Sequence, residues 1–565
     1  MDLPNVLGRA LGGRRAKIHP KVDESRRRSF DGFVSPADRR ASISGRVAPS
    51  SPLATSGSGG ARRLSALSRA ELDERAEFDR QVADLSELSN LSELGLSEEE
   101  GAALIALKAC AGAVNTGCAG AHHDSARVAT VTGTDPPSAA WAWFAHEGGA
   151  GGLGKEQQDA WLALKVSEGA HLYAVLDGHG KQYGRLAALA ARDALRAFVV
   201  ARAHELSREP EAMLRAAFLH MHEAVRTAMR EANPRIVVHP GRRAYRGPPG
   251  APSPPDEPFV GGPFLLSWTE VEEAEEGEPN HEWDAVDGGT TITVAVVLAG
   301  RRIVLAVAGD SSAVLLAQGT RAGGDGGGGG GCRAELLVEE HGPTNSSEHA
   351  RMLAYARDHG TEAGLRFVYD CPGGAHFDIF KSVPADGPDG APAFDEQAAR
   401  DADAHECNVK NARGDLFTII TVPEEEVTLP PLPATTAGAD ARMAVVREQA
   451  ITVTRSLGDF YAHHHGVSCE PELRSLELVA LKARGLLAPR LVLASDGLWD
   501  LWTFAEVARQ LNAGGGLAEC TSALGEATRA RGAEYFGEAA DNLTGVVIDL
   551  QHYLGEIREG EAGWA

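Results

Sequence analysis

Four β-rich apolar runs in this chain each meet an acidic residue at one end. In HLYAVLDGHGKQYG, for example, the apolar residues stop at a carboxylate followed by Gly-His-Gly. The four stretches are 171–184 with Asp177, 301–316 with Asp310, 490–502 with Asp496 and Asp500, and 540–550 with Asp541. Such runs, bounded by turn residues, predict β-strands, and 301–316 predicts a hairpin with Asp310 at its tip.

Other segments place their apolar residues three and four positions apart, which is the period of a helix with one buried face. GRLAALAARDALRAFVVARAHEL at 184–206 predicts a helix that covers a sheet. Asn345 followed by Glu348 resembles a capping box, and Gly360 is a helix stop signal twelve residues later. From about residue 126 onward, therefore, strands and helices alternate.

The N-terminal residues have a different character. Residues 1–70 are rich in Ser, Gly and Arg and hold 14 Lys and Arg against 5 Asp and Glu, which predicts a disordered basic tail. Ser29, Ser42 and Ser65 each follow clustered arginines, a pattern that favours phosphorylation by a basophilic kinase. A plain basic arm or a targeting segment explains the same residues equally well. Residues 71–125 predict a helical extension.

Composition narrows the class of protein. The chain has 565 residues, 43% of them hydrophobic, and a net charge of −24, which permits a substantial core and argues against nucleic-acid binding. The sequence lacks both an apolar run long enough to span a bilayer and a secretory signal. We therefore expect an intracellular monomer, in the cytoplasm, the nucleus or both. The basic N-terminus leaves organelle targeting open.

The cysteines and a histidine triplet are the residues that suggest soft metal ligands. The seven cysteines are widely spaced and include no CxxC pair, which predicts free structural thiols rather than a disulfide framework or a thiolate zinc site. The triplet His463-His464-His465 does not change this expectation, because adjacent side chains rarely point the same way on a regular element.

The strand-end aspartates suggest a hard-metal site. Taken singly, each is explained as a turn or cap residue. Several gathered carboxylates, however, repel one another unless a cation neutralises them, and Mg²⁺ and Mn²⁺ prefer oxygen ligands. Glycine after aspartate also lets a backbone carbonyl approach such an ion. If the aspartates converge, the pattern predicts a two-metal hydrolytic centre.

In order along the chain, the motifs resemble those of the metal-dependent protein phosphatases of the 2C type. The matching segments are GKEQQDA (154–160), VLDGHG (175–180), DGGTTITVAVV (287–297), LAVAGDSSAVL (305–315), EEHGPTNSSEHARM (339–352), ITVTRSLGDF (451–460), VSCEPEL (467–473), LVLASDGLWD (491–500) and DNLTGVVI (541–548). Singly, DGHG is moderately specific, whereas the ordered set over about 154–550 is highly specific.

The resemblance implies a fold and an activity. The fold is of the α+β class, a four-layer αββα sandwich of two antiparallel sheets flanked by helices. The activity is hydrolysis of phosphoserine and phosphothreonine in phosphoprotein substrates, by a water that bridges two Mg²⁺ or Mn²⁺ ions. The phosphatase domain would span 126–552, followed by a tail at 553–565, with insertions near 232–264, 319–332 and 372–405.

The same resemblance assigns roles to the acidic residues. Asp177 would bridge both metals, and Gly178 would be a ligand through its backbone carbonyl. Asp496 and Asp541 would be the remaining carboxylate ligands of the second metal. Asp310 and Asp500 would hold a weaker third ion; a turn aspartate and an acid at a helix N-terminus explain these two equally well.

The resemblance also implies roles for residues that handle the substrate. His179 would be the general acid that protonates the leaving oxygen, and Lys155 would hold the phosphate. Gln158 would meet a metal-bound water, with Asp159 a nearby carboxylate. Asp459 is expected to be a structural hydrogen-bonding residue.

Departures from the family pattern keep a second function open. Gly154 stands where arginine is frequent, Gln158 where glutamate is usual, and Lys181, expected to face solvent, where another glycine is usual. A catalytically weak or inactive regulator that keeps the fold and binds phosphoprotein partners would tolerate these changes. A phosphatase for small phosphate esters is a third possibility.

Overall fold

The computed structural model describes residues 140–149, 156–243, 259–260, 262–270, 281–318, 332–361, 363–372, 376–381, 392–428 and 443–555. The chain divides into two units, residues 22–123 and the remainder, and every described residue belongs to the second unit. The predicted tail, the helical extension and their three serines lie outside the described residues, as does Lys155.

Two five-stranded antiparallel sheets form the centre of the described unit. The β3 sheet runs in the order β2 (Ala160–Ser167), β3 (Ala170–Leu176), β11 (Ile292–Leu298), β12 (Arg302–Ala308) and β22 (Glu472–Glu477). The β23 sheet runs in the order β1 (Trp141–His146), β24 (Leu543–Asp549), β23 (Leu487–Ala494), β13 (Ser312–Gln318) and β14 (Cys332–Leu336). All neighbouring strands in both sheets pair antiparallel.

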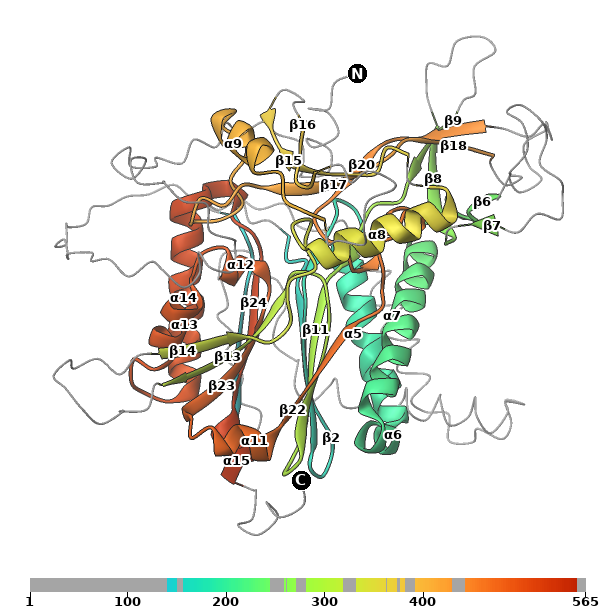
Figure 1. Cartoon of the computed structure of the whole chain (residues 1–565). Helices are drawn as coiled ribbons and strands as arrows, with labels where there is room; N and C mark the ends of the chain where they lie inside the picture. Colours follow the sequence, from blue (N-terminus) through green and yellow to red (C-terminus); the bar gives the residue numbers. More distant parts are fainter. Residues whose placement is uncertain are drawn as a thin grey trace, which may run out of the picture. The chain divides into compact units, whose positions relative to one another are not determined.

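Helices cover the outer face of each sheet (Figure 1). Beside the β3 sheet lie α5 (Gly184–Ala201), α6 (Ala203–Arg208) and α7 (Pro210–Ala232). Beside the β23 sheet lie α12 (Asp496–Trp499), α13 (Phe504–Leu511), α14 (Leu517–Phe536) and the 3₁₀ turn η4 (Gly537–Ala539). At the ends of the strands lie α11 (Leu478–Ala483) and α15 (Leu550–Gly555). The helix predicted over 184–206 is confirmed as α5 and α6.

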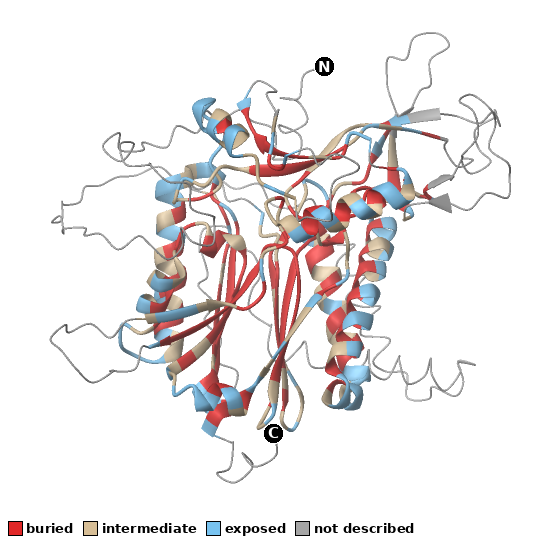
Figure 2. Ribbon diagram, viewed as in Figure 1, coloured by how far each residue is buried: buried red, intermediate tan, exposed pale blue. Residues whose placement is uncertain are grey.

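Alternate residues of the central strands point to opposite faces, and both faces are apolar. In β3, Leu172 and Ala174 pack with α5 and α7, whereas Tyr173 and Val175 pack with strands of the β23 sheet. In β13, likewise, Val314 packs toward α13 and α14. The buried strands between the helices are visible in Figure 2. Because full burial of one such side chain contributes about 2 kcal/mol, these faces specify the register. The mixed helix-and-sheet class with antiparallel sheets is confirmed.

The hairpin predicted for 301–316 is wrong. The two strands of that run, β12 and β13, belong to different sheets, so the chain crosses from one sheet to the other through Gly309, Asp310 and Ser311. Gly309 adopts a φ of 113°, and a Cβ there would lie 2.4 Å from the side chain of Thr291. The local pattern identified both strands correctly, but strand composition carries no information about the pairing partner.

Helix α8 (Ser346–His359) confirms the predicted N-cap at Asn345 and the stop at Gly360, but the Glu348 half of the predicted capping box is wrong. The Asn345 carboxamide oxygen accepts hydrogen bonds from the backbone of Ser347 (3.1 Å) and Glu348 (3.3 Å), and Gly360 is left-handed with φ 65°. The Glu348 carboxylate is directed elsewhere: it accepts from Arg455 (2.6 and 3.0 Å) and from Arg351 (2.8 and 3.1 Å). This ion-pair cluster, Glu348 with Arg351 and Arg455, ties α8 to the 451–460 segment.

Smaller sheets contain the remaining described strands. They comprise β4 (Gly178–His179), β10 (Gly289–Thr290) and β21 (Leu457–Gly458); β15 (Arg366–Asp370), β16 (His376–Asp378), β17 (Thr418–Val422) and β20 (Gln449–Ile451); β18 (Glu425–Thr428) and β19 (Met443–Val446); β5 (Ile236–His239), β8 (Phe264–Glu270) and β9 (His281–Ala285); and β6 (Arg242–Arg243) and β7 (Phe259–Val260). The remaining helices described are α9 (Glu396–Ala404) and α10 (Phe460–His464).

The prediction that all cysteines are free thiols is wrong for one pair. Cys371 follows β15 and Cys407 follows α9, and their Cα atoms come within 4.2 Å to form a disulfide. Their separation of 36 residues gave no hint that the two segments meet. Cys332, Cys469 and Cys520 are free.

Candidate metal centre

The strand-end aspartates converge at one end of the two central sheets. Asp177 follows β3, Asp496 opens α12 after β23, and Asp541 precedes β24. Burial raises the pKa of Asp177 well above its usual range, and repulsion from Asp159, Asp496, Asp541 and Asp310 raises it further. Five carboxylates from distant parts of the sequence therefore act on one another across a short distance.

The same repulsion acts on Asp496. Burial raises its pKa well above the usual range, and Asp500, Asp310 and Asp541 add to the rise, while Lys410 opposes it. Buried carboxylates with raised pKa values ionise more readily when a cation lies among them.

The backbone around Asp177 is held in place from β10. The Asp177 carbonyl accepts from the hydroxyl of Thr290 (3.0 Å) and from the amide of Thr291 (2.9 Å). A Cβ on Gly178 would lie 2.4 Å from the carbonyl oxygen of Gln158, so only glycine fits between the two segments. The sequence order Asp-Gly is thus fixed by a close backbone approach, as well as by the turn.

Neighbouring loops join the acidic strand ends to one another. The Ser495 hydroxyl donates to the Asp159 carboxylate (3.0 Å), and the backbone amide of Gln158 donates to the side-chain oxygen of Asn542 (3.1 Å). A Cβ on Gly497 would lie 2.1 Å from the Asn542 carbonyl oxygen. The segment around Gln158 is therefore packed directly against the loop that carries Asp541.

A lysine that the sequence did not indicate lies among the aspartates. The ammonium of Lys410 is 3.4 Å from Asp310 and 3.9 Å from Asp496. Burial would lower the pKa of Lys410, but Asp500, Asp310 and Asp496 hold it well above the usual range. Burial raises the pKa of Asp500 to about 7, although Lys410 opposes the rise. Lys410 lies 100 residues from Asp310, and nothing in its surrounding sequence marks it as part of this site.

His179 lies beside the aspartates and is paired with Asp459. The two side chains are 2.7 Å apart, from Nε2 to Oδ2, and the Ser456 hydroxyl donates to the same carboxylate oxygen at 2.6 Å. Burial would lower the pKa of His179, but the Asp459 carboxylate holds it above the usual value. A Cβ on Gly289 would lie 2.1 Å from Asp459, which accounts for a glycine in the DGG motif. Asp459 is thus a hydrogen-bonding partner, as predicted.

The remaining predicted site residues are placed as follows. The Gln158 side-chain amide donates to the Gly180 carbonyl at 2.7 Å and so holds the DGHG loop. Asp159 is buried and contributes to the raised pKa of Asp177. Lys155 and Gly154 precede the described segment, and the role of Lys155 stays a prediction.

The donor set fits hard divalent cations. Its side-chain donors are carboxylates, and one ammonium stands against at least five of them. Oxygen donors with excess negative charge are what Mg²⁺ and Mn²⁺ require. The residues that would hold such ions are Asp177, Gly178, Asp496 and Asp541, with Asp159 close by.

Several solved structures similar to this chain are phosphatases with low sequence identity to it. One is the serine-threonine phosphatase 2C of Toxoplasma gondii, 14% identical, covering 74% of this chain and 97% of that one, with a TM-score of 0.39. Another is the serine/threonine phosphatase of S. agalactiae, 14% identical, with 72% and 98% covered and a TM-score of 0.34. A third is the catalytic domain of the phosphatase PstP with two manganese ions, 17% identical, with 72% and 96% covered and a TM-score of 0.30. At these TM-scores, no residue role is transferred.

Comparison with known protein families finds two matches along the chain. No curated protein matches the chain. Within the described residues, no helix is long and apolar enough to cross a bilayer. Two family models, both described as protein phosphatase 2C, match residues 152–322 and 438–534. The first match contains Asp177 and His179, and the second contains Asp459 and Asp496. Over these two segments, the chain is similar to the protein phosphatase 2C family.

Proposed function

We propose that this protein hydrolyses phosphoserine and phosphothreonine in proteins with the help of two divalent cations, Mg²⁺ or Mn²⁺. The observation that carries the proposal is the convergence of Asp177, Asp496 and Asp541 beside the His179–Asp459 pair. The two matches to protein phosphatase 2C models support metal-dependent phosphatase chemistry in general. The choice of protein substrates rests on the family alone.

The carboxylates have the task of holding cations and keeping them in place. Asp177 lies centrally, since the other four carboxylates all raise its pKa, and we assign it to both cations. The rigid Asp177 carbonyl, held by Thr290 and Thr291, fixes the Gly178 carbonyl next to it. When bound, two such cations neutralise phosphate charge and make a water a better nucleophile.

We assign His179 as the general acid, which donates a proton to the leaving serine or threonine oxygen. Its Nε2–H donates to Asp459, so the proton available for transfer is the one on Nδ1. Burial opposes protonation, but Asp459 holds the pKa of His179 above its usual value, which favours the doubly protonated ring. Ser456 in turn fixes the Asp459 carboxylate.

Lys410 replaces the third cation that the family resemblance implied. Its ammonium already lies 3.4 Å from Asp310, and its pKa is held high by Asp500 and Asp310. A divalent ion bound between those carboxylates would meet a positive charge at close range. We therefore assign two cations to this centre, with Lys410 as a permanent third charge.

The central sheets and their helices are proposed to form the four-layer αββα sandwich. Three separate apolar clusters support this arrangement: one between α5, α7 and the β3 sheet, one between the two sheets, and one between the β23 sheet and α13 with α14. The centre would then lie where both sheets end, as expected for residues on loops that a rigid scaffold positions.

A metal-dependence assay on matched variants tests the function. Release of phosphate from a phosphothreonine peptide is measured with Mn²⁺ and with EDTA, for wild type, Asp541→Asn and Asp549→Asn. Asp549 ends the same strand, β24, that Asp541 precedes, so it controls for effects on the strand. We expect turnover with Mn²⁺ only, a loss in Asp541→Asn, and wild-type turnover in Asp549→Asn.

The opposite results point to the other functions. Activity that persists in EDTA contradicts the proposed mechanism. Tight phosphopeptide binding by calorimetry without turnover indicates the inactive regulator, for which the changes at Gly154 and Gln158 are the support. Turnover of small phosphate esters but not of peptides indicates the third possibility.

A further inference from the structure

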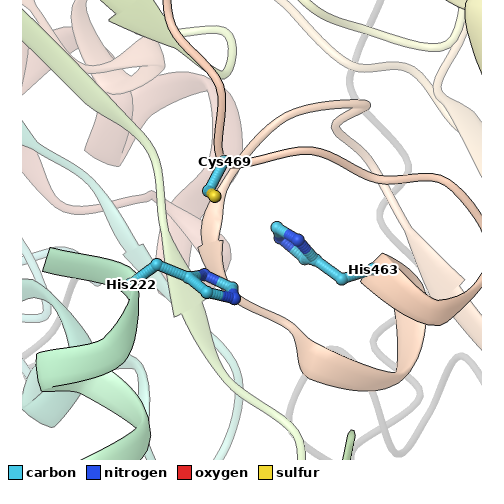
Figure 3. A group of neighbouring side chains, drawn as sticks. All are labelled: His222, His463 and Cys469. Carbon is cyan, nitrogen blue, oxygen red and sulfur yellow. The ribbon is translucent and has the colours of Figure 1, made fainter. Parts of the chain in front are cut away.

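The triplet His463-His464-His465 at the end of α10 divides between two clusters. His463 lies against His222 and Cys469, and the three side chains point toward one another (Figure 3). His464 and His465 both turn to the carboxylate of Glu425, at the start of β18. The expectation that these side chains diverge is right for the triplet as a whole and wrong for the second and third histidines.

The separation of Glu425 and His464 in the second cluster matches that of two ligands on one metal ion, and His465 lies slightly farther away. Glu425 Oε2 is 3.4 Å from Nε2 of His464 and 3.8 Å from Nε2 of His465. Hydrogen bonds from nitrogen to oxygen are shorter, about 2.7–3.2 Å. Two ligand atoms that each lie about 2.0–2.2 Å from a tetrahedral Zn²⁺ are about 3.4 Å apart.

The orientation of His464 presents a lone pair to this cluster. Its Nδ1 is 3.1 Å from the carbonyl oxygen of Gly262, which only accepts, so Nδ1 carries the hydrogen. In the neutral ring, the lone pair on Nε2 then faces the Glu425 carboxylate, and two electron-rich atoms repel unless a cation lies between them. A backbone carbonyl behind the histidine is a common arrangement at metal sites.

Burial strengthens the attraction between the Glu425 carboxylate and a cation beside it. The side chains of His464 and His465 are 0% and 3% exposed, and that of Glu425 is 14% exposed. Water therefore screens the carboxylate poorly. A single ion among the three ligand atoms, which lie within 4.8 Å of one another, would contact both histidines and the carboxylate at once.

We propose that Glu425, His464 and His465 bind one divalent transition-metal ion of the Zn²⁺ class, with a water as fourth ligand. Two imidazoles and one carboxylate suit this class, whereas Mg²⁺ prefers oxygen donors alone. The site is separate from the carboxylate centre, and it does not depend on the proposed phosphatase function.

The ion would hold α10 against β18. Tyr461 on the same helix donates its hydroxyl to the Pro423 carbonyl at 2.7 Å, so α10 already contacts the segment before β18. Helix α10 begins at Phe460, the residue after Asp459, which holds His179. The bound metal would thus stiffen the element that fixes the partner of His179.

The first cluster provides the matched control. There the Gly458 amide donates to Nδ1 of His222 (3.3 Å), which uses that lone pair, and burial raises the pKa of the Cys469 thiol to about 11. Its ligand atoms also lie within 4.8 Å of one another, so proximity is the same in both clusters. Of the two clusters, the second is the one that presents its donors ready for a metal.

The experiment is a Zn²⁺ and Co²⁺ titration of the full chain after chelator treatment, in excess Mg²⁺ to occupy the carboxylate centre. Stoichiometry is read by native mass spectrometry, and the Co²⁺ form by its visible absorption. We expect one Zn²⁺ per chain and a four-coordinate Co²⁺ spectrum without a thiolate charge-transfer band. Affinity should fall more than tenfold in Glu425→Gln but not in Cys469→Ser. If His465→Gln folds better than Glu425→Gln, the same loss of affinity is expected in that variant.

Three results overturn the proposal. They are no stoichiometric Zn²⁺ binding under excess Mg²⁺, unchanged affinity in folded Glu425→Gln and His465→Gln, or a thiolate band that disappears in Cys469→Ser. The last result would move the site to the cluster of Figure 3. A far-ultraviolet circular dichroism spectrum like that of wild type establishes that each variant is folded.

Discussion

Two buried acidic groups in this chain have opposite electrostatic surroundings. Asp177 is buried among other carboxylates, and its pKa is raised well above the usual range. Glu348 is also buried, but hydrogen bonds from Arg455 and Arg351 outweigh the effect of burial and lower its pKa to about 2. The first group has unmet negative charge and the second has none. A buried carboxylate is therefore evidence for a cation site only when its neighbours leave its charge unbalanced.

The largest expected effect comes from removing the central carboxylate. Asp177→Asn should lower phosphopeptide turnover by about 100-fold or more, because both proposed cations lose a shared ligand. In EDTA, however, the same variant should unfold at a higher temperature than wild type, since repulsion with Asp496 and Asp541 is relieved. Activity assays and thermal unfolding in EDTA measure the two effects.

This opposite response of activity and stability separates a functional charge from a structural one. If Asp177→Asn lowers the melting temperature in EDTA as well, packing and hydrogen bonding of Asp177 outweigh the repulsion among the aspartates. Asp549→Asn, at the far end of β24, should change neither quantity.

Removal of Glu348 tests the other side of the comparison. The folded pKa of about 2 lies below the ordinary value of 4.5, so the paired carboxylate stabilises the fold above pH 4.5. This stability, about 3 kcal/mol, is lost as the pH falls toward 2. Glu348→Gln should therefore cost about that much at pH 7 and progressively less in acid, as measured by urea unfolding.

The exposed Glu231, at the end of α7, is the control for Glu348. Glu231→Gln should leave the free energy of unfolding unchanged at both pH values. An equal cost of Glu348→Gln at pH 7 and at pH 2.5 would show that packing, rather than the ion pairs, determines its contribution.

Lys410 partly balances the negative charge of the aspartate cluster, so its removal should increase the difference in charge balance between Asp177 and Glu348. Lys410→Met should raise the affinity for divalent cations by about tenfold, because a positive charge 3.9 Å from Asp496 is removed. It should also add one bound Mn²⁺ per chain, counted by equilibrium dialysis. The exposed Lys381→Met is the control, and unchanged Mn²⁺ stoichiometry in Lys410→Met would contradict the replacement of a third cation.

The aspartates of the cluster could be predicted from the sequence, but the lysine that partly neutralises them, Lys410, could not. Asp177, Asp496 and Asp541 could be found because each stands at the end of an apolar run, and strands of one core bring their ends together. Lys410 could not, because it lies in a loop with no periodic pattern before or after it. Its position depends on tertiary packing, which local composition does not encode.

Pairing partners escaped prediction for the same reason. Strands β12 and β13 were predicted from their composition, yet they belong to different sheets. Cys371 and Cys407 are joined because the segment after α9 lies against the end of β15, where the Asn408 amide donates to the Asp370 carbonyl. His464 and His465 meet Glu425 because α10 ends in an irregular turn, where the rule for regular elements does not hold.

The smallest expected effect concerns Gln158, where the family pattern usually has glutamate. The side-chain amide of Gln158 donates to the Gly180 carbonyl at 2.7 Å, whereas a glutamate would place a second acceptor against that oxygen. Gln158→Glu should therefore destabilise the DGHG loop by about 1 kcal/mol and lower turnover about fivefold. Gln157→Glu is the control, because Gln157 contacts the Thr544 hydroxyl at 3.5 Å, and a hydroxyl can donate as well as accept. Equal losses in both variants, measured by urea unfolding and phosphopeptide turnover, would mean that added charge near the aspartates, rather than the lost donor, decides the outcome. A gain in Gln158→Glu would mean that the carboxylate is recruited to the cations and that the amide weakens this enzyme.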